Sequence, residues 1–201
     1  NFYALNYLIE NYKDLKFGLS FSSLFELCIS NHHFFILKIL LKYNLRIATK
    51  KEIIELLQQS SISSPQIDHV MSIISNLSFK GAGVDTTMPT IEGKIVQDAD
   101  RLDSIGAIGV ARCFAYGGHV GHPIYDPTLK PVLHSSEKEY RKSKGTSISH
   151  FYEKLLLLKD RMQTNSGRKV AEIRHQYIES FLNQFLREWN GNDIDETLFQ
   201  K

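Results

Sequence analysis

The chain has 201 residues, of which 42% are hydrophobic and 23% are charged, and 24 basic against 22 acidic residues give it a formal net charge of +2. These proportions are ordinary for a folded globular protein and exclude a mainly disordered chain, while the lack of a sustained heptad pattern excludes a coiled-coil rod. The charge lies too close to neutral to indicate binding to nucleic acid or to a membrane surface.

Short helices are predicted for the first part of the chain. This part, residues 1–64, contains no proline and one glycine. Thr49 and Glu52 have the spacing of a capping box, which places a helix start there. The four predicted helices cover about residues 3–11, 22–29, 33–43 and 49–59.

Longer helices are predicted from Ser64 onward. Ser64-Pro65 is a favourable helix start, because serine caps helices and proline is tolerated in the first turn, and this helix should end near Asn76. Thr90 is predicted to cap a longer helix from Ile91 to about Ala115. Glycines and prolines between residues 116 and 147 then predict a long loop, and such loops in compact domains are usually functional or mobile.

Two helices are predicted at the end of the chain, over about 149–162 and 166–189, with Gly191 as the residue that terminates the second. No stretch alternates in polarity as a half-buried strand does, and no repeat is visible. The sequence therefore predicts an all-α fold. The residues expected on the buried face of the last helix are Val170, Ile173, Tyr177, Phe181 and Phe185.

The cysteines and the apolar runs give expectations about the compartment. The longest apolar candidate, residues 33–41, includes Lys38 and is too short to span a bilayer. Cys28 and Cys113 match no metal-binding or redox spacing. We therefore expect reduced thiols in a cytoplasmic protein without a membrane segment. The first residue is Asn1 rather than Met, which indicates a trimmed start or a fragment.

The strongest local signal is the acidic run from Gln97 to Asp103. Helical spacing places Gln97, Asp100, Asp103 and Ala107 on one stripe, and the small residues that follow suggest close packing. Aspartate destabilises a helix relative to alanine, and a buried aspartate requires a cation or metal as its partner. Asp98 alone is expected to be a surface acid beside Arg101, whereas Asp100 and Asp103 are expected to be functional carboxylates.

Several motifs in the same order resemble those of the small bacterial HD-domain phosphohydrolases, and they are most like the YpgQ-like subgroup of nucleotide pyrophosphohydrolases. The resemblance runs from about Pro65 to Trp189. Any one motif would be a weak signal, but their shared order is specific. The motifs are FKGAGV at 79–84, EGKIVQDADRLD at 92–103, GAIG at 106–109, FAYGGH at 114–119, YDP at 125–127 and HFYEKL at 150–155.

The resemblance implies an HD-type helical bundle that holds a divalent metal through one histidine, a tandem His-Asp pair and a later aspartate. That later aspartate corresponds to Asp100, and Asp103 would lie near the metal-bound water or beside a metal ligand. Mixed nitrogen and oxygen ligands favour Mn, Mg, Fe or Co over a closed zinc site. The metal would lower the pKa of a bound water and neutralise phosphate oxygens. The implied activity is hydrolysis of nucleoside triphosphates or related phosphate esters and anhydrides.

Phosphate binding is assigned to the glycine-bearing loop. Lys80 lies beside Gly81 and Gly83, so a cation and backbone N–H groups can meet an anion there, with an ordinary turn as the alternative. Arg101 and Arg112 can pair with carboxylates or with phosphate, and structural pairing is the favoured role of Arg101. With Lys80, the residues expected to act in catalysis are Asp103 and Arg101.

Further substrate-contacting candidates are His69, His119 and Tyr125. His69 can line the cleft or be a satisfied core histidine. His119 and His122 have metal-like spacing, but two ligands are too few for a structural zinc site, so their loop is interpreted as a lid or a recognition segment. Tyr125 can stack on a nucleobase, and simple packing is the equal alternative.

The chain departs from the family in one respect: it contains no His-Asp dipeptide. The tandem pair is expected near residues 25–40, where His32 and His33 are followed by Phe34. Two explanations stay open, a decayed site or a wrong reading frame or start in the first 64 residues. The expected parts are thus an atypical segment over 1–64, an HD-like helical domain over 65–190 and a tail over 191–201.

The departure defines an alternative function. The chain would then be a catalytically impaired HD-like module that has lost the metal and binds a nucleotide or a protein partner. In either case the expected partner is a nucleotide or phosphate ester, with no membrane and no nucleic acid. A homodimer is compatible with the sequence but is not required by it.

Overall fold

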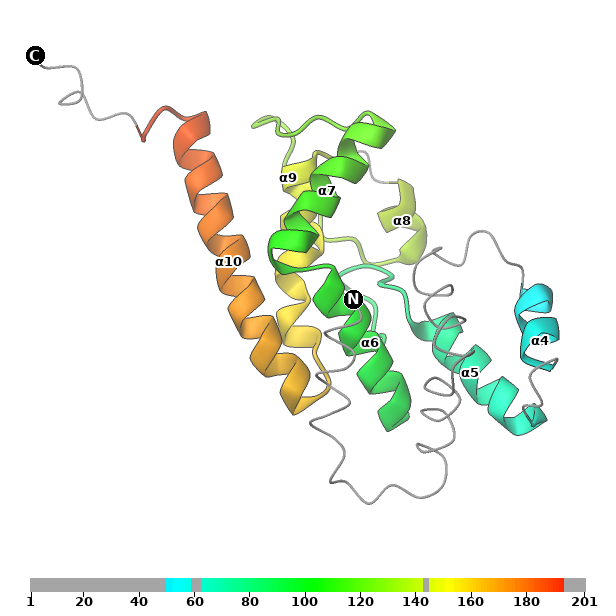
Figure 1. Cartoon of the computed structure of the whole chain (residues 1–201). Coiled ribbons are helices and arrows are strands. Elements are labelled where there is room, and N and C mark those ends of the chain that lie inside the picture. Colours follow the sequence, from blue (N-terminus) through cyan, green and yellow to red (C-terminus); the bar gives the residue numbers. More distant parts are fainter. Residues whose placement is uncertain (1–49, 59–62, 143–144, 194–201) are drawn as a thin grey trace, which may run out of the picture. The chain divides into compact units, whose positions relative to one another are not determined.

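The computed structural model describes residues 50–58, 63–142 and 145–193, and within these ranges the chain forms helices and no strand (Figure 1). The predicted all-α class is therefore confirmed. The helices expected at 3–11, 22–29 and 33–43 lie outside the described residues. The elements are α4 (Lys50–Gln58), α5 (Ser64–Asn76), α6 (Ile91–Asp103), α7 (Gly106–Val120), α8 (Glu137–Lys142), α9 (Ser147–Glu153), the short 3-10 helices η1 (Leu155–Leu157) and η2 (Lys159–Arg161), and α10 (Asn165–Trp189).

Two compact units make up the chain. The amino-terminal unit contains the described residues up to Phe79 together with Asp85–Asp100, and the carboxy-terminal unit contains Lys80–Val84 and the described residues from Arg101 onward. Helix α6 passes from one unit into the other after Asp100. Each unit is built around its own buried side chains.

In the amino-terminal unit, α4 packs on α5 through Ile53, Leu57 and Ile67. The helix predicted over 49–59 is thus present as α4. The cap of α5 is Ser63 rather than the predicted Ser64, because the backbone N–H and the hydroxyl of Ser63 both donate to Gln66 Oε1, at 3.1 and 2.7 Å. This pairing of the capping residue with the residue three positions later is a capping box, which is favoured at helix starts.

The core of the carboxy-terminal unit lies among α7, α9 and α10. Helix α10 packs against α7 and η2, and α9 packs against α7 (Figure 1). Leu102, Phe151 and Ile178 are completely buried there. Phe114 contacts the rings of Phe151, Phe181 and Phe185 at centroid distances of 5.7 to 6.5 Å, so an aromatic cluster joins the three helices.

The single helix predicted from Ile91 to Ala115 is wrong, because α6 ends at Asp103 and α7 begins at Gly106. Gly106 has φ +75°, a left-handed conformation that breaks the helix and that side-chain-bearing residues rarely adopt. Gly109 follows with no room for a side chain, because its Cβ would lie 2.2 Å from the Ser104 carbonyl oxygen. Ala107 therefore does not continue the stripe of Asp100 and Asp103.

The long loop begins later than the predicted Tyr116 and is interrupted by α8. Helix α7 continues to Val120 and is ended by Gly121, which has φ +76°. Gly117 lies within α7 and faces α9. A Cβ on it would meet Ser147 Oγ at 2.2 Å, so the missing side chain lets α9 approach α7. The predicted glycine break is thus a packing contact.

The last two predicted helices need one correction each. The helix expected over 149–162 is shorter, since α9 ends at Glu153, where Lys154 leaves helical geometry at φ −141° and two 3-10 turns follow. Helix α10 agrees with the prediction, and Gly191 has the left-handed φ of +68° expected of its terminating residue. Its buried face is different from the predicted one and consists of Gly167, Ala171, His175, Ile178 and Leu182.

Ile173 and Tyr177 are 71% and 48% exposed, so the predicted apolar face of α10 is wrong at these positions. A long helix can carry apolar residues on several of its faces. In α10, the face that packs against α7 and η2 and becomes buried is the one that begins with the small residues Gly167 and Ala171.

Candidate functional site

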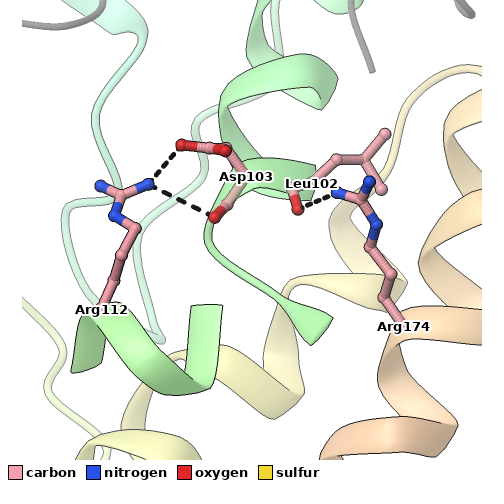
Figure 2. Close-up of polar contacts among 4 residues, drawn as sticks. All are labelled: Leu102, Asp103, Arg112 and Arg174. Atoms are coloured by element: carbon pink, nitrogen blue, oxygen red, sulfur yellow. Dashed lines mark hydrogen bonds and ion pairs between the residues drawn. The ribbon is translucent and has the colours of Figure 1, made fainter. Parts of the chain in front are cut away.

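The carboxyl end of α6 is held by two arginines from other helices. Arg112 of α7 forms an ion pair with Asp103 Oδ2 and also donates to the Asp103 backbone carbonyl at 3.3 Å, and Arg174 of α10 donates to the Leu102 carbonyl (Figure 2). The last carbonyls of a helix lack partners within the helix, and cationic side chains are favourable there. The structure thus brings together Asp103 and Arg112, two residues expected to act in the site.

The two members of this pair differ in exposure. The Asp103 side chain is 26% exposed and the Arg112 side chain is 60% exposed. An exposed guanidinium keeps N–H donors available to solvent while its orientation is set by the carboxylate. The end of α6 therefore presents an oriented cation at the surface of the carboxy-terminal unit.

Asp100 lies one turn before Asp103 on α6 and is half-buried, in the amino-terminal unit. The surface position expected for Asp98 is wrong, because this residue is completely buried. Helix α6 is buried on almost every side from Ile95 to Leu102, and Asp98 lies within this buried stretch. The nearby Gln97 is also completely buried and donates to the Asn76 carbonyl at 3.0 Å, at the end of α5.

The glycine-bearing loop around Lys80 is fixed through its backbone. Gly83 N–H donates to the His134 carbonyl at 3.1 Å, and Val84 N–H donates to the Gly81 carbonyl at 3.3 Å. Gly81 has φ +124°, and a Cβ there would lie 2.9 Å from the His134 carbonyl oxygen. Two N–H groups of this loop, one of them that of Gly83, therefore already have acceptors within the carboxy-terminal unit.

Arg161 was not identified from the sequence, yet three hydrogen bonds join it to this loop. Its guanidinium donates to the carbonyls of Gly81, Ala82 and Val84. Arg101, which is 5% exposed, donates in turn to the backbone carbonyl of Arg161. No spacing rule could reveal this role, because all the acceptors are main-chain carbonyls, which every residue type carries.

His69 lies on α5 in the amino-terminal unit, and its Nε2 is 3.8 Å from Glu92 Oε2. The Glu92 side chain is 7% exposed, whereas that of His69 is 32% exposed. His69 therefore has a carboxylate neighbour inside its own unit.

The remaining substrate-contacting candidates lie near the end of α7. His119 is exposed in the last turn of α7. Tyr125 packs edge-on against Phe185 and Trp189, with ring centroids 5.9 and 5.1 Å apart. The contacts of Tyr125 are thus the packing contacts that formed the alternative to base stacking.

Three partly buried titratable residues, Cys113, Tyr140 and His150, come from α7, α8 and α9. Burial, reinforced by the charges of Lys154 and His122, lowers the pKa of His150 to about 4. The ring of Tyr140 stacks on His150 with centroids 6.3 Å apart, and burial raises its pKa. Burial likewise raises the pKa of the Cys113 thiol to about 11. At neutral pH these groups are therefore uncharged.

A metal site requires several ligands in one place. Across residues 50–58, 63–142 and 145–193, no three His, Cys, Asp or Glu residues lie close enough together to hold a metal ion. The described residues, Asp100 included, therefore do not by themselves form a complete ligand set. None of the helices in the same ranges has the length and the apolar character that crossing a membrane requires.

Comparisons with known proteins identify the relatives of the chain. The sequence matches no model of a known protein family. An HD-superfamily hydrolase from Bacillus thuringiensis has a crystal structure that is 37% identical, with a TM-score of 0.55, and the match covers 94% of this chain and 85% of that one. A crystal structure from Lactobacillus plantarum is 39% identical, with a TM-score of 0.66, over 70% of this chain and 66% of that one.

The protein YpgQ of Bacillus subtilis is a further relative, 37% identical over 135 residues, which is 67% of this chain and 58% of YpgQ. The chain thus spans less than two thirds of the length of YpgQ and of the L. plantarum protein. YpgQ has been crystallised in complex with ADP, and that structure is 33% identical, with a TM-score of 0.53, over 70% of this chain and 64% of YpgQ. From these similarities, the chain belongs to the HD superfamily of hydrolases, with YpgQ among its relatives.

Proposed function

We propose that the chain is a phosphohydrolase of the HD superfamily that acts on nucleoside triphosphates or related phosphate esters and anhydrides. The observation that carries this proposal is the Asp103–Arg112 pair at the end of α6, in which the carboxylate orients an exposed guanidinium. Guanidinium groups bind phosphate oxygens with two parallel hydrogen bonds. The complex of YpgQ with ADP supports a nucleotide as the ligand.

Each candidate residue has a role in this proposal. Arg112 and Lys80 bind phosphate oxygens, and Asp103 orients Arg112. Charge stabilisation by fixed cations is usually a large part of the catalysis of phosphate chemistry. The nucleotide contacts expected of Gly81, His69, His119 and Tyr125 stay predictions, and the HD-like domain is proposed to cover residues 65–190.

Membership of the HD superfamily suggests a divalent metal in general. We assign Asp100 as one ligand and Mn, Mg, Co or Fe as the metal, because a carboxylate is a suitable ligand for such cations. No catalytic step is assigned to the metal, since the described residues do not complete a ligand set. A cytoplasmic location is also proposed, because Cys113 is a free thiol.

A second function is a nucleotide- or protein-binding module without hydrolytic activity. Two observations favour it: the chain has no His-Asp dipeptide, and no three potential ligands gather within the described ranges. This module would use the same phosphate-binding cations. It therefore predicts nucleotide binding without turnover.

The experiment that separates the two functions measures metal content, turnover and binding on the purified full chain. A panel of nucleoside triphosphates is incubated with Mn or Co, phosphate and pyrophosphate release is followed, and ADP affinity is measured by calorimetry. Arg112→Gln should weaken phosphate contact about tenfold or more, because a hydrogen bond to a charged group is worth about 1.5–3 kcal/mol. Arg187→Gln, an exposed arginine near the end of α10, is the matched control and should change neither quantity.

Turnover that falls in Arg112→Gln and persists in Arg187→Gln supports the phosphohydrolase. ADP binding with no turnover of any nucleotide, with or without added metal, supports the binding module instead. A chain that neither turns over nucleotides nor gains thermal stability from them is neither of the two, because a bound ligand must stabilise the folded state.

A further inference from the structure

We propose that Arg161 is a positioning residue for the nucleotide site, and that it fixes the main chain of the 80–84 loop so that Lys80 is held for phosphate binding. This inference rests on the proposed function for the part that concerns Lys80. The observation behind it is the set of three loop carbonyls, of Gly81, Ala82 and Val84, that accept hydrogen bonds from the one guanidinium of Arg161.

The loop needs an external restraint because of its composition. Gly81 and Gly83 lack side chains that could anchor the loop, and glycine has the largest backbone freedom of all residues. The loop also donates a hydrogen bond, from the Gly83 N–H to the His134 carbonyl at 3.1 Å. Three of its carbonyl groups and one of its N–H groups are therefore hydrogen-bonded to residues outside the loop, which restrains the backbone next to Lys80.

Arg161 is itself well anchored. It belongs to η2, its N–H donates to the Leu158 carbonyl at 3.2 Å, and its carbonyl accepts from the buried guanidinium of Arg101. The route of restraint therefore runs from Arg101 through Arg161 to the loop, entirely within the carboxy-terminal unit. Arg101 then serves phosphate binding indirectly, by holding the residue that holds the loop.

The planar fork of a guanidinium explains why this position needs arginine. A guanidinium has five N–H donors in a fixed plane, and two of its nitrogens here reach three carbonyls. A lysine keeps the charge but offers one compact ammonium on a flexible stem, so it cannot reproduce this pattern. Arg161→Lys is therefore a conservative test that removes the geometry without removing the charge.

Two measurements on the full chain test the inference. Hydrogen–deuterium exchange of the peptide that covers residues 79–85 should be about tenfold faster in Arg161→Lys, because the loss of charge-assisted hydrogen bonds loosens the loop. The ADP dissociation constant should rise by about tenfold in the same variant. Arg168→Lys is the matched control: Arg168 donates to the Met162 carbonyl at 3.1 Å, next to Arg161, and should change neither measurement.

A double-mutant cycle shows whether Arg161 acts through Lys80. Lys80→Met should weaken ADP binding, and adding Arg161→Lys to it should weaken binding by less than about twofold more, because a positioning residue has nothing left to position. Additive losses would overturn this inference. Arg101→Lys is a second variant, which should also accelerate loop exchange and keeps the test available if Arg161→Lys does not fold.

The two levels of the inference fail in different ways. Unchanged loop exchange in a folded Arg161→Lys protein overturns the positioning role. Faster exchange in a chain whose wild type binds no ADP supports the fixation of the loop and overturns both the nucleotide site and the role assigned to Lys80.

Discussion

Three glycines of α7 provide a graded test of the packing described for the carboxy-terminal unit. A Cβ added at Gly118 has no atom within 4 Å, one at Gly117 would lie 2.2 Å from the Ser147 hydroxyl oxygen, and one at Gly109 would lie 2.2 Å from the Ser104 carbonyl oxygen. All three positions lie in the same helix, so the gain in helix propensity from alanine is similar at each. We therefore expect stability in the order Gly118→Ala, Gly117→Ala, Gly109→Ala.

The magnitudes follow from what each added methyl group meets. Gly118→Ala should stabilise the protein by about 0.5–1 kcal/mol through the lower backbone entropy of the unfolded chain. Gly109→Ala requires a main-chain carbonyl to move by about 0.8 Å to reach the 3.0 Å that real Cβ contacts respect. Overpacking of this kind costs about 1–3 kcal/mol, and the gain from alanine of about 0.5–1 kcal/mol offsets part of it. A net loss of about 1 kcal/mol is therefore expected, which lowers Tm by roughly 2–4 °C.

Gly117→Ala should fall between the other two, because a hydroxyl group can rotate away whereas a main-chain carbonyl cannot. The pair Gly117→Ala with Ser147→Ala tests this reason, since the remaining contact would be at 3.5 Å from Ser147 Cβ, an ordinary van der Waals distance. The double variant should thus lose less stability than the sum of the two single variants.

Thermal and urea unfolding followed by circular dichroism measure all of these variants. The reasoning is refuted if Gly109→Ala is as stable as Gly118→Ala, which would mean that the turn between α6 and α7 does not bring Ser104 against α7. It is also refuted if Ser147→Ala fails to relieve Gly117→Ala.

Three further predictions concern ionisable groups. The pKa of His150 is about 4 in the folded protein and near 6.5 in the unfolded one, so between these values the unfolded chain binds more protons. The free energy of unfolding should therefore fall by on the order of 3 kcal/mol as the pH drops from 7 to 4. His150→Gln should reduce this pH dependence, as measured by urea unfolding. The Cys113 thiol, with its pKa raised from 9.0 to about 11, should react about a hundredfold more slowly with iodoacetamide at pH 8 than an unperturbed thiol, as peptide mass spectrometry can measure, and equal rates would contradict its burial. Asp103→Asn should lower the free energy of unfolding by less than about 1 kcal/mol, because the Arg112 side chain is 60% exposed. The same variant should weaken ADP binding, because Arg112 loses the carboxylate that orients it. A large loss of stability with unchanged ADP affinity would show that the pair is structural.

Local signals predicted the elements that depend on local chemistry. The bounds of α10 and its terminating glycine, and the start of α5 next to Pro65, follow from capping preferences that act within a few residues. The break between α6 and α7 was missed because Ser104 and Ile105 carry no turn signal, and Gly106 alone is compatible with a helix that continues. Gly106 adopts a left-handed φ of +75° there, and the Arg174 side chain packs so closely that a Cβ on Gly106 would approach it to 3.0 Å.

The candidate site was predictable only where side chains pair with side chains. Asp103 was singled out by its helical stripe and by the family resemblance, and Arg112 because a guanidinium can pair with carboxylates or with phosphate. Arg161 could not, since its partners are backbone carbonyls, and Asp98 was misplaced because burial of a helix on nearly all sides depends on neighbours distant in sequence. The roles proposed for Lys80, Asp100 and the other candidates stay predictions.

The contact between Tyr125 and Trp189 has a practical consequence, because Trp189 is the single tryptophan of the chain. Its indole stacks on Phe185 at 5.9 Å and meets Tyr125, from the segment after α7, at 5.1 Å. Emission from this one fluorophore thus reports whether that segment rests on the end of α10. The protein carries an intrinsic optical probe at this point, and titration with a nucleotide can be followed there without any label.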